Sequence, residues 1–126
     1  MTKKILLVDD EPDITFTIKD ILEDAGFEVD AFNDPTIALK SYRINFYDLV
    51  ILDIKMPTMD GFELYNRLRA KDSRVKICFL TASEFYYEEF RKMRFLLDKT
   101  PDGEYFIQKP IKIDNLIKKL NALMNK

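Results

Sequence analysis

The stretch Leu49-Val50-Ile51-Leu52-Asp53-Ile54-Lys55-Met56-Pro57 decides the fold. Four apolar residues, two of them β-branched, run directly into a carboxylate and then into a segment that ends in proline. Such a run predicts a buried central strand of a parallel sheet, with Asp53 at its carboxyl end. Open α/β sheets bind ligands at that edge, so Asp53 is the first candidate functional residue.

The totals predict one globular domain over residues 1–126, because 47% of the chain is hydrophobic and this length can bury a sizeable core. A formal net charge of -2 supplies no broad basic field for nucleic acid. No apolar run is long enough for a secretory signal or a membrane span of about eighteen residues. The chain has no histidine, which excludes a histidine triad and histidine-bound zinc. We expect a cytoplasmic protein without direct nucleic-acid or membrane contact, in which Cys78 is a small buried hydrophobe.

Apolar runs and helical apolar spacing alternate along the rest of the chain. Pro12 and Pro35 are placed to open helices, and Gly26 is placed to end one. Alternating strands and helices imply a parallel sheet with helices on both faces, although alternation alone does not fix the strand order. The second helix is expected to turn four side chains inward: Ile37, Ala38, Ser41 and Tyr42. The predicted strands are residues 4–8, 27–32, 48–53, 75–80 and 104–108, and the predicted helices are residues 12–25, 35–42, 62–71, from about 84 onward, and 113–123.

Polar residues follow several of these strands, and the carboxyl ends of parallel strands share one edge of the sheet. Two like charges about 4 Å apart cost about 4 kcal/mol at an effective dielectric of about 20, so carboxylates gathered there need raised pKa values or a bound cation. Oxygen ligands with room for water suit Mg²⁺ better than zinc. The residues expected to meet at this edge are Asp9, Asp10, Asp53, Thr81 and Lys109.

This set of side chains suits phosphoryl transfer, which needs an in-line nucleophile and positive charge near the phosphoryl oxygens. Asp53 can attack phosphorus, Lys109 can pair with the added charge, and Thr81 can donate a hydrogen bond to a phosphoryl oxygen. The mixed anhydride would change the charge at Asp53 from about −1 to about −2. The residues therefore favour a phosphorylation site.

Each of these residues also has a plain structural interpretation. Asp9 or Asp10 could cap the first helix, and Asp53 could form a turn with its own backbone. Thr81 could be a loop hydroxyl, and Lys109 could be a solvated strand end. Their joint placement after four different strands favours the functional interpretation.

With these residues assembled, the chain resembles the response regulator receiver domains of two-component signalling, the CheY-like family. The resemblance spans nearly the whole chain, and the ordered set of motifs is far more specific than any one of them. The motifs are Ile5-Leu6-Leu7-Val8-Asp9-Asp10-Glu11, the stretch from Leu49 to Pro57, Met59-Asp60-Gly61, Phe79-Leu80-Thr81-Ala82 and Lys109-Pro110.

The resemblance implies a (βα)5 doubly wound, flavodoxin-like fold, with a five-stranded parallel sheet in the order 2-1-3-4-5. It implies that Asp53 accepts phosphate from the phosphohistidine of a sensor histidine kinase or phosphotransfer protein. Mg²⁺, or Mn²⁺ in its place, would be bound directly by Asp10 and Asp53, by the backbone carbonyl of Lys55, and by Asp9 through water. The peptide bond between Lys109 and Pro110 would be cis.

The resemblance also implies a switch, in which Thr81 moves toward the phosphoryl group and Phe106 turns inward behind it. Many receivers have tyrosine at that position, and a core phenylalanine that never moves is the alternative for Phe106. A downstream protein or a second copy would bind the surface of the fourth helix, fifth strand and last helix. Lys55 and Ser83 are expected to affect the phosphate lifetime. The chain departs from the family in an extra loop at 98–104 and in aromatic residues that either meet a partner or pack beneath that loop: Phe85, Tyr86, Tyr87, Phe90 and Phe95.

Three classes of function compete. The first is a phosphorylation-controlled signalling switch, either without a tethered output domain or excised from a longer regulator or hybrid kinase. It would not be an enzyme beyond self-phosphorylation from a phosphodonor and autodephosphorylation. The second is a phosphatase like the haloacid dehalogenases, which usually place a second aspartate where this chain has Lys55. The third is a phosphate-independent binding module, against which the intact set of edge residues argues.

Overall fold

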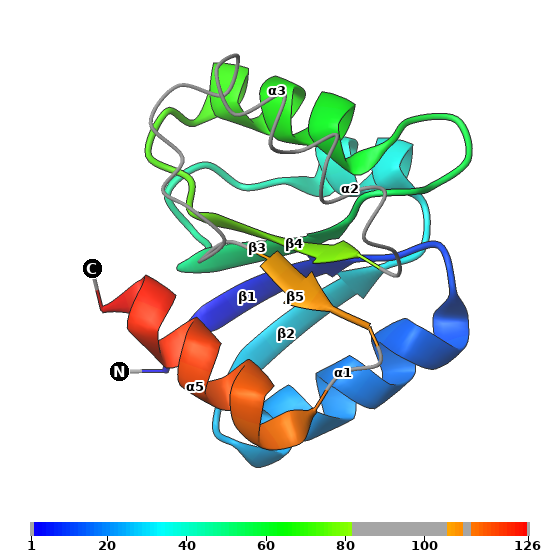
Figure 1. Cartoon of the computed structure of the whole chain (residues 1–126). Coiled ribbons are helices and arrows are strands. Elements are labelled where there is room, and N and C mark those ends of the chain that lie inside the picture. Colours follow the sequence, from blue (N-terminus) through cyan, green and yellow to red (C-terminus); the bar gives the residue numbers. More distant parts are fainter. Residues whose placement is uncertain (1, 82–105, 110–111, 126) are drawn as a thin grey trace.

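The computed structural model describes residues 2–81, 106–109 and 112–125, without the side chains of Thr81, Phe106 and Gln108. Its strands form one parallel sheet in the order β2-β1-β3-β4-β5 (Figure 1). This order and the helices on both faces confirm the flavodoxin-like fold class. The strands are β1 (Lys4–Val8), β2 (Glu28–Phe32), β3 (Leu49–Asp53), β4 (Ile77–Thr81) and β5 (Phe106–Gln108).

The described helices cover the two faces of the sheet in pairs. Figure 1 shows α2 and α3 on one face and α1 and α5 on the other. None of these helices combines the length and the apolar character that crossing a bilayer requires. The helices are α1 (Pro12–Asp24), α2 (Pro35–Ser41), α3 (Gly61–Lys71) and α5 (Ile113–Met124).

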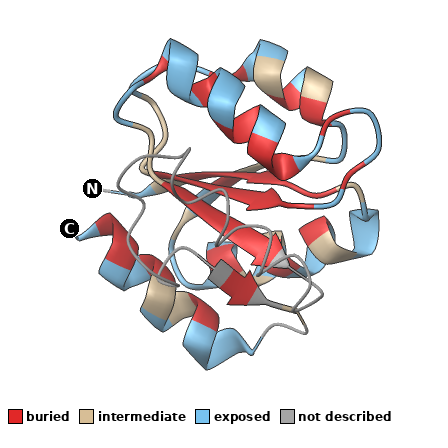
Figure 2. Cartoon of the chain, turned by 45° about the horizontal axis from the view of Figure 1, so that its top comes forward, coloured by how far each residue is buried: buried red, intermediate tan, exposed pale blue. Residues whose placement is uncertain are grey.

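The core forms two apolar clusters, because successive side chains of each strand point to opposite faces of the sheet. In β3, Val50 and Leu52 pack on the side of α3, whereas Leu49 and Ile51 pack on the side of α1 and α5. All five residues of β3 are buried, which Figure 2 shows as a continuous red centre of the sheet. The predicted central strand is therefore confirmed, and so is the burial of Cys78, which is 0% exposed in β4.

Local signals in the sequence fix where the helices begin and end. Pro12 and Pro35 occupy the first turns of α1 and α2, and the Asp34 carboxylate accepts a hydrogen bond from the Thr36 N–H at 2.8 Å. Gly26 follows α1 with φ of 97°, a left-handed conformation that glycine adopts without steric cost. These boundaries confirm the predicted ones to within a residue or two.

One prediction about α2 was wrong. Ala38 and Tyr42 are buried as expected, but Ile37 is 52% exposed and Ser41 is also exposed. Ile37 and Ser41 are four residues apart and share one side of the helix, about a third of a turn away from the side that carries Ala38. A helix of seven residues buries only one narrow side, and the sequence did not decide which.

Several predictions fall on residues that the structure does not describe. They concern the fourth helix, the loop at 98–104 with the aromatic residues before it, and the position of Ser83. The Lys109–Pro110 peptide bond and the side chains of Thr81 and Phe106 also lie outside the described part of the chain.

Candidate functional site

Three carboxylates lie together at the carboxyl edge of the sheet. Asp53 is the last residue of β3, and Asp9 and Asp10 directly follow β1, the neighbour of β3 in the sheet. One oxygen from each of these three aspartates lies within 4.8 Å of the other two. The predicted convergence is therefore present for the acidic residues.

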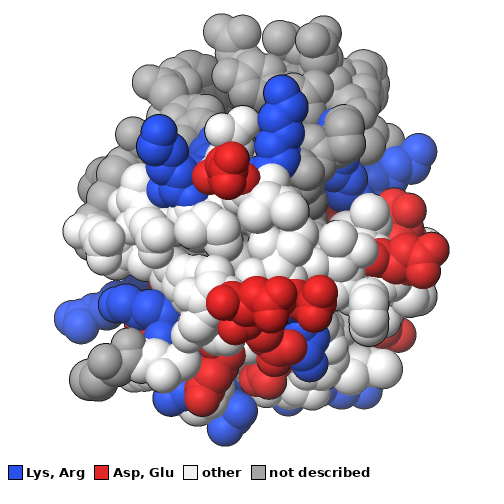
Figure 3. All heavy atoms as spheres, turned by 90° about the horizontal axis from the view of Figure 1, so that it is seen from below, with Lys and Arg blue, Asp and Glu red and all other residues white. Residues whose placement is uncertain are grey.

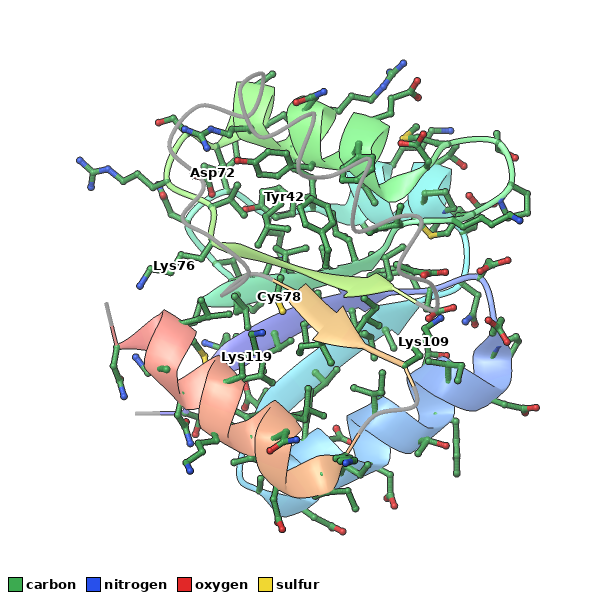
Figure 4. The ribbon with its side chains drawn as sticks, in the orientation of Figure 1. Tyr42, Asp72, Lys76, Cys78, Lys109 and Lys119 are labelled. Carbon is green, nitrogen blue, oxygen red and sulfur yellow. The ribbon has the colours of Figure 1, made fainter. Side chains whose placement is uncertain are left out.

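Lys109 completes this cluster from the end of β5. Its Nζ lies 2.9 Å from Asp9 Oδ2, 3.4 Å from Asp53 Oδ1 and 3.6 Å from Glu11 Oε1. The Lys109 side chain is only 12% exposed, so it is not the solvated strand end of the alternative interpretation. Figure 4 shows Lys109 at this edge, far from the labelled Tyr42 and Asp72 at the other end of the sheet. The Lys109 amine thus lies within ion-pair distance of the carboxylates of Asp9, Asp53 and Glu11.

Asp9 is held inside the cluster by its own loop. The side chain is 0% exposed, and its Oδ1 accepts a hydrogen bond from the Glu11 N–H at 2.9 Å. Its Oδ2 makes the ion pair with Lys109 but accepts no hydrogen bond of good geometry. Glu11, rather than either aspartate, is the N-cap residue of α1, and its side chain makes no capping hydrogen bond. The structure therefore does not support the interpretation of Asp9 as the cap of α1.

Burial and like charge shift the ionisation of the cluster. Burial, and then the neighbouring Asp9 carboxylate, raise the pKa of Asp53 to about 7, although Lys109 opposes the shift. Burial also raises the pKa of Asp9. Burial disfavours the charged form of Lys109, but Asp9 and Asp53 outweigh it and raise the pKa of the amine. Among the described residues, the acids at this edge therefore outnumber the amine of Lys109 that pairs with them.

The excess of carboxylates over amines raises the question whether these residues suit a divalent cation. Asp9 Oδ2 faces the Lys109 amine without a hydrogen bond of good geometry, and three carboxylate oxygens lie close enough to share one ion. An all-oxygen set with few protein ligands matches the preference of Mg²⁺ or Mn²⁺. Among the described residues, the donors present thus fit the predicted metal.

The main chain after Asp53 is folded tightly against helix α3. The Gly61 N–H donates to the Ile54 carbonyl at 2.8 Å, and a Cβ at position 61 would overlap the Asp53 carbonyl oxygen. Thr58 has φ of 74°, and the Met59 N–H donates to the Pro57 carbonyl at 2.8 Å, which closes a γ-turn around Thr58. The sequence motif Met59-Asp60-Gly61 does not by itself predict this close approach, which depends on how the loop packs against the end of β3.

Two further predicted site residues are Thr81 and Lys55. β4 ends at Thr81, paired in register with Gln108, but the Thr81 hydroxyl is outside the described atoms. Lys55 is exposed. The sequence missed two residues that contact the cluster: Glu11, as a second acid beside Lys109, and Asn33, whose amide donates to the Asp9 carbonyl at 2.8 Å. Glu11 belongs to the motif that begins at Ile5, but no role at the site was predicted for it, and none was predicted for Asn33.

Fold and site together define an open, doubly wound α/β protein with a cluster of carboxylates and a lysine at the carboxyl edge of its sheet. Residues 5–121 match the model of the response regulator receiver domain, and the chain belongs to this family. It is therefore a phosphorylation-activated signalling domain of the two-component type and not a classical enzyme. The phosphatase and the phosphate-independent module are not favoured.

Individual relatives agree with this assignment. The regulatory protein VanRB of Enterococcus faecalis is 33% identical over 126 residues, which are 100% of this chain and 54% of that protein. The regulatory protein PhoP of Bacillus subtilis, named for alkaline phosphatase synthesis, is 39% identical over 93 residues, which are 74% of this chain and 38% of PhoP. The chain spans about half the length of the first curated relatives that it matches.

Solved structures show the same likeness. The non-phosphorylated HemR receiver domain from Leptospira biflexa has a TM-score of 0.83 at 30% identity, covering 99% of this chain and 96% of that one. The response regulator TrrA from Thermotoga maritima, in complex with Mg²⁺ and BeF, has a TM-score of 0.79 at 35% identity, covering 97% and 99%. Receiver domains bind Mg²⁺ in an acidic pocket and interact with histidine kinases or phosphotransfer proteins.

Proposed function

We propose that Asp53 is the phosphoryl acceptor of this receiver domain and that the acceptor reaction depends on Mg²⁺ or Mn²⁺. The observation that supports this most directly is the position of its carboxylate at the edge of the sheet. It lies 3.4 Å from Lys109 Nζ, and one of its oxygens lies within 4.8 Å of oxygens of Asp9 and Asp10. Asp9 shares the burial and these neighbours, but its Oδ1 accepts a hydrogen bond from the Glu11 N–H at 2.9 Å and its Oδ2 lies 2.9 Å from Lys109 Nζ, so both of its oxygens are already engaged.

In the proposed reaction an oxygen of Asp53 forms a bond to phosphorus while the bond from phosphorus to the donor nitrogen breaks. The donor imidazole leaves with the electron pair of that bond. Asp53 must be ionised to attack, and the Lys109 ammonium favours the ionised form against burial and the charge of Asp9. Small phosphodonors would phosphorylate Asp53 in the same way. Attack of water on phosphorus would then break the bond to Asp53, release inorganic phosphate and restore the carboxylate.

The metal would be held by Asp10, Asp53 and the Lys55 carbonyl directly, and by Asp9 through water. When bound, Mg²⁺ supplies positive charge beside the phosphoryl oxygens. Asp9 would keep its hydrogen bond from the Glu11 N–H and its ion pair with Lys109, so its role is to orient this edge. The fit of the acidic oxygens described above supports these assignments.

Lys109 would also report the reaction to the rest of the fold. The phosphoryl group adds about one negative charge at Asp53, and Lys109 would move from its shared position toward that charge. Thr81 would hydrogen-bond the phosphoryl group, and Phe106 would turn inward behind it. Because Lys109 directly follows β5, we expect the change to reach β5, α5 and the fourth predicted helix.

The partners follow from the same proposal. The donor would be a sensor histidine kinase or a phosphotransfer protein, and a downstream protein or a second copy would bind the surface around β5 and α5. Residues 1–126 would act as a single receiver domain, and its cytoplasmic location stays a prediction. Figure 3 shows acidic side chains next to basic ones on the described part of one face, and the absence of direct nucleic-acid contact stays a prediction.

The deciding experiment is incubation with Mg²⁺ and acetyl phosphate, followed by intact mass. The unmodified protein should gain one acid-labile phosphoryl group, and Asp53→Asn should gain none. Asp20→Asn, at an exposed position of α1, is the matched control and should behave like the unmodified protein. A phosphoryl group retained by Asp53→Asn, or none on the unmodified protein, would contradict the proposal.

A further inference from the structure

Asn33 bridges three elements at the edge of the sheet. It directly follows β2, and its Nδ2 donates to the main-chain carbonyl of Asp9 at 2.8 Å and to the Thr15 hydroxyl at 2.9 Å. Asp9 belongs to the loop after β1, and Thr15 belongs to α1. One side chain therefore ties the loop that carries the acidic pair to the helix behind it.

Thr15 extends this link into the first turn of α1. Thr15 is 5% exposed, and its hydroxyl donates to the Pro12 carbonyl at 3.0 Å while it accepts from Asn33. The hydroxyl thus uses both its donor and an acceptor position, and the bond fixes which way its hydrogen points. The Asn33–Thr15–Pro12 chain holds the beginning of α1 at a defined distance from Asp9.

The Asn33 amide is not occupied with helix α2, although it lies two residues before its first turn. Asp34 caps that helix, with Oδ1 accepting from the Thr36 N–H at 2.8 Å and from the Thr36 hydroxyl at 2.6 Å. Asn33 itself is exposed, so its truncation opens no buried cavity. A role in the core or in capping α2 therefore does not explain its two bonds.

We propose that Asn33, acting with the Thr15 hydroxyl, is a positioning residue for the acidic pair Asp9 and Asp10. The inference rests on the proposed function of that pair at the metal pocket. Like charges drive the carboxylates of Asp9, Asp10 and Asp53 apart. The Lys109 amine offsets this repulsion at the side chains of Asp9 and Asp53, so a hydrogen bond to the main chain of the loop adds support that these charges do not give. Asn33 holds the main chain of Asp9 directly, and it does so without adding charge.

The first test is the affinity for Mg²⁺ alone, from a titration followed by amide chemical shifts. Loss of one hydrogen bond of average strength should weaken Mg²⁺ binding roughly fivefold in Asn33→Ala. Asn121→Ala, an exposed position on α5, should leave the affinity unchanged. Wild-type affinity in Asn33→Ala would overturn the inference.

Two substitutions of Thr15 test whether its hydroxyl is the group that matters. Thr15→Ser keeps the hydroxyl and should bind Mg²⁺ as the unmodified protein does, whereas Thr15→Val removes the acceptor and should show the weakening of Asn33→Ala. The double variant Asn33→Ala with Thr15→Val should be no weaker than Asn33→Ala alone, because both remove one link. Fully additive losses would show two independent effects and overturn the shared role.

A measurement without metal separates this inference from the proposed function. The Glu11 N–H donates to Asp9 Oδ1, so its hydrogen-exchange rate reports how firmly the loop is held. In metal-free protein, Asn33→Ala should speed this exchange several-fold relative to Asn121→Ala. Unchanged exchange would overturn the positioning role, while unmodified protein that binds no Mg²⁺ would contradict only the proposed function.

Discussion

Asp53 and Asp72 are two buried aspartates, 5% and 7% exposed, that lie near opposite ends of helix α3. Burial and the charge of Asp9 raise the pKa of Asp53 to about 7. At Asp72 burial acts in the same direction, but hydrogen bonds outweigh it and lower the pKa. These bonds come from the Asn45 N–H at 3.1 Å and the Tyr42 hydroxyl at 2.8 Å, with the Arg74 N–H at 3.2 Å as a third.

The difference shows how one residue type serves two purposes. Asp72 is surrounded by neutral donors that fit it, so it joins the loop after α2 to the end of α3 and has no need of a ligand. Asp53 lies among acids and shares Lys109 with them, so a bound cation would stabilise its ionised form. Burial alone does not mark a functional carboxylate; the balance of donors around it does.

The largest expected effect comes from removing the amine that pairs with Asp53. Lys109→Met should slow phosphorylation by acetyl phosphate by about a hundredfold, because Lys109 Nζ lies 3.4 Å from Asp53 Oδ1 and places positive charge beside the added group. Lys76→Met, at the other end of the sheet where Lys76 Nζ donates to the Leu123 carbonyl at 3.2 Å, should leave the rate unchanged. Intact mass against time measures both, and equal rates for the two variants would contradict the assignment of Lys109.

The next effect is on stability at the Asp72 end. Asp72→Ala should lower the free energy of unfolding by about 2 kcal/mol, because it leaves the buried Tyr42 hydroxyl and the Asn45 N–H without their acceptor. Tyr42→Phe should cost about 1 kcal/mol, since it removes one donor and leaves the other two. Urea unfolding measures the loss. Asp72→Ala should still be phosphorylated, and a stability equal to that of the unmodified protein would show that these bonds contribute nothing.

The two aspartates should also differ in how stability depends on pH in metal-free protein. The folded pKa of Asp53, about 7, lies above the unfolded value of about 3.9, so folding takes up a proton between them. The Asp53 contribution therefore weakens stability as pH rises from about 4 to about 7. Asp72 has the opposite sign, because its pKa is lowered, and its contribution is lost only as pH falls below about 4.

Urea unfolding in the presence of a chelator checks these signs. Asp53→Asn should be more stable than the unmodified protein at pH 7.5, and the difference should shrink toward pH 5. A constant difference across that range would contradict the raised pKa of Asp53. Asp72→Asn serves as the comparison, since it should be less stable than the unmodified protein throughout.

The smallest expected effect is on the stability of two turns in which a residue other than glycine has positive φ. Among the described residues other than glycine, Thr58 and Asn45 have positive φ, of 74° and 61°. A β-branched residue is costly in this region, whereas asparagine tolerates it. Thr58→Gly should therefore raise stability by about 1 kcal/mol, after the entropy cost of glycine, and Asn45→Gly should change it by less than about 0.5 kcal/mol. Thermal unfolding measures both, and a loss of stability in Thr58→Gly would refute the strain.

The sequence predicted the elements and the acidic edge because both depend on local patterns. The apolar run before Asp53 and the position of Pro12 each determine a short segment of structure. The strand order came from the family resemblance, since the same alternation of elements fits several orders. Asn33 and Asp72 could not be predicted, because their contacts join residues 24 and 30 positions apart and depend on how two loops meet in space.

The buried thiol of Cys78 offers a practical consequence. It is the only cysteine in the chain, it lies in the central part of the sheet, and burial raises its pKa to about 12. Because only an exposed, ionised thiol reacts with labelling reagents, modification must wait until the sheet opens. The rate of labelling would therefore measure, without any engineered probe, how often β4 separates from its neighbours before and after Asp53 is phosphorylated.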